Sequence, residues 1–395
     1  MFFSLFSKYK KNKHLVLLID IGSASVAAAL ADIEPGVVPN ILATARKDIT
    51  FQEKLSPPEF LRSMNQALER VLKSVQEKTK KTGIPATIFC SLSSPWFLLK
   101  SRHIAITEEK PITITQSSLD KILDEGIAQL KAELKETLPP EDMRIVEKKI
   151  IQTKLNGYEI KNPYGQKAAR VELTMTVGVS SKQVTDRIER TVQNFFHNDP
   201  IHFGAFPVAA FSVIRDIFPT EKSFLFLDIT GESTDVSLIN NDVLAGTITF
   251  PRGKNFIVRE ISSRFNMPHE AATSVLNMFL GGALDSKRHN EILALMTKVE
   301  SDWLARFEKT LTSLGASGIV SRKIFFMSDI DVAELFTGIL GKAKVPLSAN
   351  KNFDIQSIEP AVLEKFATSD PGTVRDPFLV TETLLAAKVV PQFIK

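Results

Sequence analysis

Residues 17–30 read LLIDIGSASVAAAL, and residues 225–238 read LFLDITGESTDVSL. Each stretch is an apolar strand that ends in an aspartate, followed by a tight turn of small and hydroxylated residues and a second strand. Backbone N–H groups in such turns point outward and bind phosphate oxygens. The carboxylate at the strand end, Asp20 or Asp228, is placed to hold a hydrated divalent cation beside those phosphates. Two copies in one chain predict two similar half-domains that face a common nucleotide cleft.

The composition is that of an ordinary globular protein, with 395 residues, 44% hydrophobic and 24% charged. The net charge of +4 is mild, so we expect no nucleic-acid partner, which would need a clustered basic face. Cys90 is the only cysteine, which excludes an intrachain disulfide and fits a reducing, cytoplasmic compartment. The sequence has no run of about 18 apolar residues that would predict a membrane-spanning helix. The scattered histidines lack the spacing of a zinc site.

The N-terminal residues 2–13 combine aromatic and basic side chains. The basic residues follow the apolar ones, which is the reverse of their order in a secretory signal. Aromatic residues beside a basic cluster are typical of a weak peripheral contact with a membrane surface. The alternative is a solvated start to the first strand. The residues concerned are Phe2, Phe3, Leu5, Phe6, Lys8, Lys10, Lys11 and Lys13.

Residues 1–94 have the β-β-β-α-β order of a half-domain. Apolar runs predict a strand pair at 14–33, a third strand near 40–50 and a buried strand at 86–92. Between them, residues 57–81 carry apolar side chains at helical spacing, and two prolines stand at the expected helix start.

Residues 95–200 differ in character and predict a small α+β unit inserted into the first half. A charged amphipathic helix is expected at 117–136, strands near 145–155 and 168–179, and a helix at 180–197. The chain then returns to the first half.

Residues 201–221 are expected to complete the first half with a buried helix at 203–218. Residues 222–395 are expected to form the second half. The elements predicted there are a strand–turn–strand unit at 223–250, a helix from about 255, a helix at 290–314, a strand at 323–330 and a terminal helix near 377–388.

This arrangement resembles the actin-like ATPase superfamily and, within it, the bacterial FtsA/PilM branch. Residues 20–25 (DIGSAS) look like the first phosphate loop of the family, and residues 228–235 stand in the place of the second. Residues 160–165 (IKNPYG) are similar to a stretch of the FtsA-type inserted subdomain. Residues 203–215 look like the helix that connects the halves, and KIFFMSDI (323–330) falls at the adenosine-binding strand and turn. The resemblance covers nearly the whole chain and implies an α/β, actin-like (ribonuclease H-like) two-domain fold with an inserted α+β subdomain.

The resemblance also implies a site for ATP and Mg²⁺. Asp20 and Asp228 would hold the magnesium ion through water, and Asp228 and Asp235 would serve hydrolysis, with Asp235 orienting a water molecule. From the residues alone, the two strand-end aspartates could instead accept turn N–H bonds, Asp235 could occupy a solvated strand position, and Gly253 could serve only a turn. The residues expected to bind the nucleotide are Asp20, Gly22, Ser23, Ser25, Gly231, Ser233, Thr234, Gly253, Glu270 and Ser328.

Several positions depart from the family pattern. Thr230 and Glu232 flank a single Gly231 where a glycine run is usual, and Glu232 would repel a polyphosphate. Ser328 and Asp329 stand where paired glycines are usual, and the helix at 269–278 keeps Glu270 but supplies no lysine. We therefore expect weakened nucleotide binding and at most a slow ATPase.

The function that the resemblance implies is a cytoplasmic, membrane-associated scaffold of the FtsA type. Such a scaffold links a cell-division or related assembly to the membrane and can self-associate, and ATP would bias closure of its cleft. A PilM-like protein, which binds the tail of a pilus inner-membrane protein, is the alternative. Two further classes stay open: a nucleotide-free pseudo-ATPase scaffold, and a sugar kinase-like phosphotransferase, for which no sugar-binding carboxylate cluster is evident.

Overall fold

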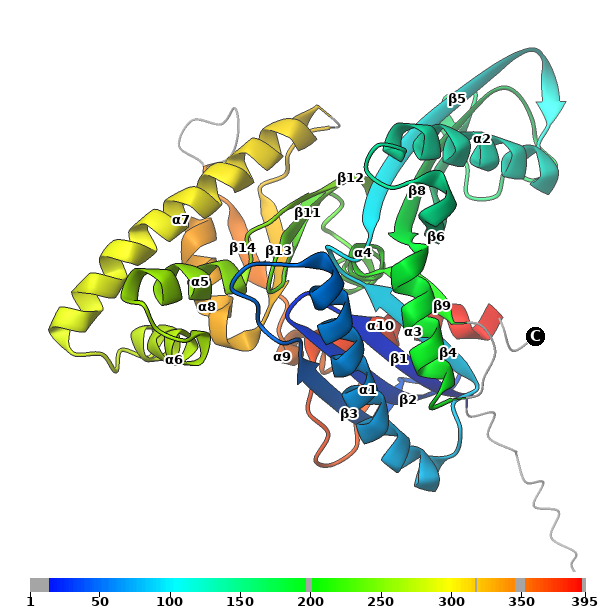
Figure 1. Ribbon diagram of the computed structural model, residues 1–395. Helices are drawn as coiled ribbons and strands as arrows, with labels where there is room; N and C mark the ends of the chain where they lie inside the picture. The colour runs from blue at the N-terminus through cyan, green and yellow to red at the C-terminus, as the bar shows by residue number, and fades with distance from the viewer. Residues whose placement is uncertain (1–13, 197–200, 317, 345–351, 393–395) are drawn as a thin grey trace, which may run out of the picture.

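The computed structural model describes residues 14–196, 201–316, 318–344 and 352–392. Figure 1 shows two α/β lobes and a smaller unit that projects from the first of them. We call these the first lobe, the second lobe and the inserted unit. The expected membrane-contact segment, residues 2–13, lies outside the described residues.

The sheet of the first lobe has the strand order β15-β3-β2-β1-β4-β9. Strands β1, β2 and β3 form an antiparallel meander, and β4 and β9 extend the sheet in parallel from β1. The last six residues of β1 are buried, because helices cover both faces of this sheet. The strands are β1 His14–Ile21, β2 Ser25–Ile33, β3 Asn40–Asp48, β4 Thr87–Leu92, β9 His202–Ala205 and β15 Thr368–Ser369.

The sheet of the second lobe repeats this topology, in the order β12-β11-β10-β13-β14. An antiparallel meander of β10, β11 and β12 is again extended in parallel, here by β13 and β14. The expectation of two related α/β halves is therefore confirmed. The strands are β10 Phe224–Ile229, β11 Thr234–Asn240, β12 Val243–Phe250, β13 Lys323–Ser328 and β14 Asp354–Ser357.

The helices cover these sheets according to their apolar faces. Helix α1 begins with Pro57 and Pro58, which suit a first turn because no intrahelical N–H bond is lost there. The buried side of α1 recurs at helical spacing from Phe60 to Val75. The first lobe contains α1 Pro57–Thr82, α3 Lys182–Gln193, α4 Phe206–Ile217, α9 Pro360–Leu363 and α10 Pro377–Val389, and the second lobe contains α5 Lys254–Phe265, α6 His269–Leu280, α7 Ser286–Gly315 and α8 Ile330–Gly341.

The inserted unit has its own sheet, in the order β5-β8-β6-β7, and two small cores of its own. Helix α2 packs on this sheet, and the first residues of β5 pair with the last of β8, with Leu98 opposite Val179. The unit therefore has a sheet separate from the two main sheets, and it contacts them where β5 lies against β12 and β6 against β9. Its elements are β5 Leu98–Thr113, α2 Gln116–Leu134, a 3-10 turn at Pro140–Asp142, β6 Met143–Leu155, β7 Tyr158–Glu159 and β8 Lys167–Ser181.

The structure corrects the sequence prediction at four places. The long strand β5 was not expected, and the helix predicted at 203–218 begins only after strand β9. Helix α3 packs against α1, so the inserted unit ends near residue 181 rather than residue 200.

The fourth correction concerns the C-terminal part of the expected second half, 222–395. Strand β15 pairs with β3, and α10 packs against β1, β2 and α4. A 3-10 turn at Val390–Gln392 ends the described chain. The stretch from α9 onward therefore completes the first lobe, because its apolar side chains join the core of that lobe.

Candidate functional site

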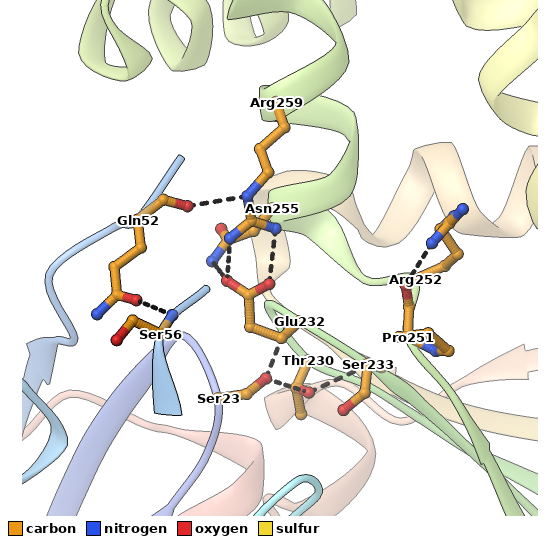
Figure 2. A network of polar contacts seen from close by, with 10 residues as sticks. All are labelled: Ser23, Gln52, Ser56, Thr230, Glu232, Ser233, Pro251, Arg252, Asn255 and Arg259. Carbon is orange, nitrogen blue, oxygen red and sulfur yellow. Dashed lines mark hydrogen bonds and ion pairs between the residues drawn. The ribbon is translucent and has the colours of Figure 1, made fainter. Parts of the chain in front are cut away.

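The two predicted phosphate loops lie directly against each other between the lobes (Figure 2). The Ser23 hydroxyl lies 2.7 Å from the Thr230 hydroxyl and accepts the Glu232 backbone N–H at 2.8 Å. Thr230 donates its own hydroxyl hydrogen to the Ser233 carbonyl, so Ser23 must donate to Thr230 Oγ1. A Cβ on Gly231 would lie 2.6 Å from the Cβ of Ala24. The opposite loop thus accepts the hydrogen of the Ser23 hydroxyl and donates to its oxygen.

The carboxylate of Asp20 is bound by an arginine of the same lobe. Arg46 donates from Nη2 to Asp20 at 2.9 Å, from Nη1 to Ser25 at 2.6 Å and from Nε to Asp376 at 2.6 Å. The guanidinium also lies 5.4 Å from the ring centre of Phe378. A fixed cation therefore stands beside the aspartate for which a magnesium ion was predicted.

Arg46 was not among the residues predicted from the sequence. The strand register explains its position. Asp20 lies opposite Ala27 on β2, and Ala27 lies opposite Arg46 on β3. Residues directly opposite one another in antiparallel strands share a face of the sheet. A long cationic side chain can therefore reach across alanine to the carboxylate.

Burial raises the pKa of Asp20 to about 6, although the Arg46 charge acts in the opposite direction. The second oxygen of this carboxylate, Oδ1, is buried and has no hydrogen-bond partner among the described residues. Burial also raises the pKa of Glu382, and the nearby charge of Asp20 adds to that increase. The floor of the cleft in the first lobe is therefore a desolvated acidic site that a single guanidinium compensates in part.

The carboxylates of Asp228 and Asp235 face each other across β10 and β11, and both are buried. Ser93 donates to Asp228 at 2.9 Å, and Ser94 donates to Asp235 at 2.7 Å. Burial raises the pKa of both carboxyls, and Asp235 adds to the increase at Asp228. Each of the two predicted catalytic carboxyls therefore accepts a hydroxyl hydrogen from the first lobe.

Three further predicted ligands also contact protein groups. Ser233 donates to the Ser94 carbonyl at 3.1 Å, and Thr234 donates to the Arg252 carbonyl at 2.7 Å. The carbonyl of Gly22 accepts the indole N–H of Trp96 at 2.7 Å.

The last three predicted residues lie in different surroundings. Gly253 approaches the second loop so closely that a Cβ would lie 2.0 Å from the Thr230 carbonyl oxygen. Ser328 is buried and donates to the Asp329 carbonyl. Glu270 is exposed on α6 beside His269, and it does not line the hollow between the loops.

Glu232, which was expected to repel a polyphosphate, is neutralised by the second lobe. Arg259 binds both of its oxygens, at 2.7 and 2.8 Å, and Asn255 donates to it at 2.7 Å (Figure 2). The Nε of Arg259 donates to the Gln52 carbonyl of the first lobe at 2.9 Å. The arginine also lies over the ring of Phe51. This group of residues therefore fixes the second loop and bridges the lobes.

The predicted adenosine turn is likewise occupied by a charge pair. Lys254 lies 3.3 Å from Asp329 and 2.6 Å from Asp331. Both carboxylates raise the pKa of Lys254 against the effect of burial. Asp329, which stands where the resemblance would put a glycine, thus forms an ion pair with Lys254 of α5.

The space that remains between the loops is small. The hollow lined by Asp20, Ser23, Arg46 and Gly231 measures about 20 Å³, which is room for roughly one water molecule. A neighbouring hollow of about 380 Å³ reaches outward past Ser328 and is lined by both acidic and basic side chains. Triphosphate and a hydrated Mg²⁺ therefore do not fit between the loops as they are arranged here.

The described residues contain no group of three or more His, Cys, Asp or Glu side chains placed to hold a metal ion. Within the same residues, every helix is too short or too polar to cross a bilayer.

The chain is similar to known proteins in sequence and in structure, although no protein-family model matches it. It is 22% identical over 267 residues to the cell division protein FtsA of Escherichia coli (strain K12), which is 67% of this chain and 60% of that protein. It is 18% identical over 272 residues to FtsA of Neisseria meningitidis serogroup B, which is 67% of this chain and 61% of that protein. The chain thus spans about 60% of the length of these curated relatives.

Among solved structures, the chain is similar to the PilM–PilN type IV pilus biogenesis complex. The TM-score is 0.62 and the identity 14%, over 93% of this chain and 97% of that chain. This likeness concerns the fold, which extends through both lobes and the inserted unit. The chain therefore has the actin-like fold, and its resemblance to the FtsA/PilM branch is borne out by FtsA in sequence and by PilM in structure.

Proposed function

We propose that this chain is an actin-like interaction scaffold whose lobes are held together by its own side chains instead of by ATP and Mg²⁺. The observation that carries the proposal is the Arg46 guanidinium, which binds Asp20, Ser25 and Asp376. These contacts occupy the place where the resemblance would put a cation and a phosphate. Of the alternatives left open by the sequence, the pseudo-ATPase is thus favoured over the slow ATPase.

Direct hydrogen bonds between the lobes support the same proposal. Ser23 bonds to Thr230, and Ser93 bonds to Asp228. A nucleotide that bridged the two loops would have to displace such contacts and separate oppositely charged groups. A buried ion pair that loses one partner leaves an uncompensated charge, which is strongly unfavourable. Closure without nucleotide is therefore the state that these residues stabilise.

We infer a protein partner in a membrane-linked assembly. FtsA is a cell division protein, and PilM was solved in a complex with PilN. These likenesses support a role in cell division or in type IV pilus assembly, with self-association as a further property of such a scaffold. The aromatic and basic residues 2–13 support a cytoplasmic position at the inner face of the membrane.

Thermal melting of the full chain with and without MgATP tests the nucleotide-free state. A ligand that binds only the folded protein must raise the melting temperature. We expect the same melting temperature in Mg²⁺ alone, in MgADP and in millimolar MgATP. A rise that is specific to MgATP would contradict the proposal.

Binding assays with purified partners test the scaffold role. The candidates are the cytoplasmic tail of a pilus inner-membrane protein and a division filament protein from the same cell. Binding of one of them, with equal affinity in the presence and absence of MgATP, is expected. If neither candidate binds, or if binding requires ATP, the proposal fails.

A further inference from the structure

Three of the exposed large apolar side chains lie at one end of the first lobe. Val37 is 54% exposed, Val38 is 51% exposed and Ile84 is 71% exposed. The two valines belong to the turn between β2 and β3, and Ile84 belongs to the loop between α1 and β4. We call this end of the lobe, with the adjacent Lys80 and Lys81, the basal pole.

The strand register places these segments together. His14, the first residue of β1, pairs with Ile33 at the end of β2, and its ring bonds to Thr87 at the start of β4. The N–H of Ala86 donates to the carbonyl of Leu15. The turn that carries the valines and the loop that carries Ile84 therefore flank the start of β1 on its two sides.

Basic residues lie next to Ile84 in the chain. Lys80 and Lys81 lie in the last turn of α1 and are exposed. The acidic residues nearest in the sequence to Ile84 and to the two valines are Glu77 and Glu34. Cations at the C-terminal end of a helix are favoured by the helix dipole.

The chain that precedes β1 has a matching composition. Residues 2–13 must join the lobe at His14, which lies at the basal pole. They contain three phenylalanines, a leucine and four lysines, namely Phe2, Phe3, Leu5, Phe6, Lys8, Lys10, Lys11 and Lys13. The same two kinds of side chain thus occur in the segment and on the folded surface that it joins.

We propose that the basal pole is a docking surface for an anionic lipid bilayer, and that it acts together with residues 2–13. This proposal rests on the membrane linkage in the proposed function and identifies a second contributor to it. Protruding apolar side chains such as Ile84 enter the headgroup region, while lysine ammonium groups bind lipid phosphates. Asp20 lies at the opposite end of β1, so the cleft faces away from the bilayer.

Vesicle co-sedimentation of the full chain tests the proposal. The vesicles contain phosphatidylcholine alone or phosphatidylcholine with phosphatidylglycerol. We expect binding only to the anionic vesicles, and weaker binding as salt rises. Lys80→Glu with Lys81→Glu should weaken binding by about thirtyfold or more, since each lysine near an anionic surface contributes roughly 1 kcal/mol. Ile84→Ser should weaken it by about tenfold, because an apolar side chain no longer enters the lipid.

Matched variants on the second lobe serve as controls. Lys287→Glu with Lys309→Glu on α7, and Ile319→Ser, change the same kinds of exposed residue far along the chain. These variants should bind the anionic vesicles as the unchanged protein does. Circular dichroism and melting temperature check that every variant is folded.

The outcomes separate the pole from the N-terminal segment. If deletion of residues 2–13 abolishes binding while both pole variants bind fully, the pole is not a docking surface, although the membrane linkage stands. If the full chain binds no vesicles, the membrane linkage and the pole are both overturned. Neither result affects the nucleotide-free closure, which the MgATP melting experiment tests separately.

Discussion

At the scale of single residues, the central feature is the contact between Arg46 and two carboxylates, the buried Asp20 and the half-buried Asp376. Asp20 is 2% exposed, and one of its oxygens relies entirely on this guanidinium. Asp376 caps helix α10 with its other oxygen. One side chain thus compensates charge on β1 and also fixes the start of the C-terminal helix.

Arg46→Ala should lower the free energy of unfolding by roughly 3 kcal/mol, because it leaves the buried carboxylate of Asp20 without its cation. Urea denaturation followed by circular dichroism measures the change. Arg62→Ala, at an exposed position on α1, is the matched control and should change stability by less than about 0.5 kcal/mol. Equal effects of the two substitutions would show that the buried ion pair has no special role.

The raised pKa of Asp20 predicts a pH dependence of stability. The pKa of about 6 exceeds the ordinary value of 3.8, so the folded state binds the proton more tightly than the unfolded chain does. The stabilisation from this group is complete below about pH 4 and is lost as pH rises through about 6. Asparagine resembles the neutral carboxyl and does not titrate, so Asp20→Asn should remove this pH dependence of stability.

We therefore expect the melting temperature of Asp20→Asn to exceed that of the unchanged protein most clearly at pH 7. The difference should shrink as the pH falls toward 4. Melting curves of both proteins across this range provide the measurement. A difference that stays constant with pH would mean that Asp20 does not titrate in this window.

The site residues that could be predicted from the sequence are those next to a strong local pattern. Asp20 and Asp228 were found because an apolar strand ends at each of them. Arg46 could not be found in that way, since its role depends on a register across three strands. Glu270 was placed by resemblance alone, and nothing in its local sequence indicates which way its helix turns.

At the scale of elements, the second hairpin is held in place by the turn before α5. The N–H groups of Lys254 and Asn255 donate to the carbonyls of Thr230 and Gly231. Gly253 lies within this contact, where backbone approaches backbone. The start of α5 thus sets the position of the second loop.

Gly253→Ala should destabilise the protein by roughly 2–3 kcal/mol, because its Cβ would lie 2.0 Å from a backbone oxygen that cannot move aside easily. Gly338→Ala is the control, since no atom lies within 4 Å of the added Cβ on α8. That substitution should stabilise the helix by up to about 1 kcal/mol. A neutral effect at Gly253 would rule out the close approach.

Most elements were predictable where periodicity is strong, and α1 is the clearest example. Strand β5 was missed because its outer half is exposed and charged, so it shows neither alternation nor a buried run. Strand β9 has only four residues and runs directly into α4. The return of α10 to the first lobe could not be predicted, because an apolar helix does not indicate which of two cores it joins.

At the scale of the whole molecule, the lobes are joined by hydroxyl groups, an arginine and a shared core. Phe224 and Phe226 of the second lobe belong to the same apolar cluster as β1 and α4. Arg259 donates across to the loop that precedes α1. The two lobes are therefore packed against each other at the cleft.

Ser23→Ala should loosen this interface and lower the free energy of unfolding by about 1–2 kcal/mol, since the Glu232 N–H loses a buried partner. Hydrogen exchange should accelerate at residues 22–25 and 230–233 together, because each loop protects the other. Ser74→Ala removes only an exposed contact within α1 and should leave both loops unchanged. Faster exchange in one loop alone would contradict mutual protection.

The pairing of Leu98 with Val179 has a practical consequence for this architecture. The chain leaves the first lobe and re-enters it at neighbouring positions of one ladder, where opposed α-carbons lie about 5 Å apart. A short glycine bridge could therefore close that gap, and the excised piece could be grafted into another host as a portable module. Evolution could likewise have gained, lost or exchanged this module without changing the strand order of either large sheet.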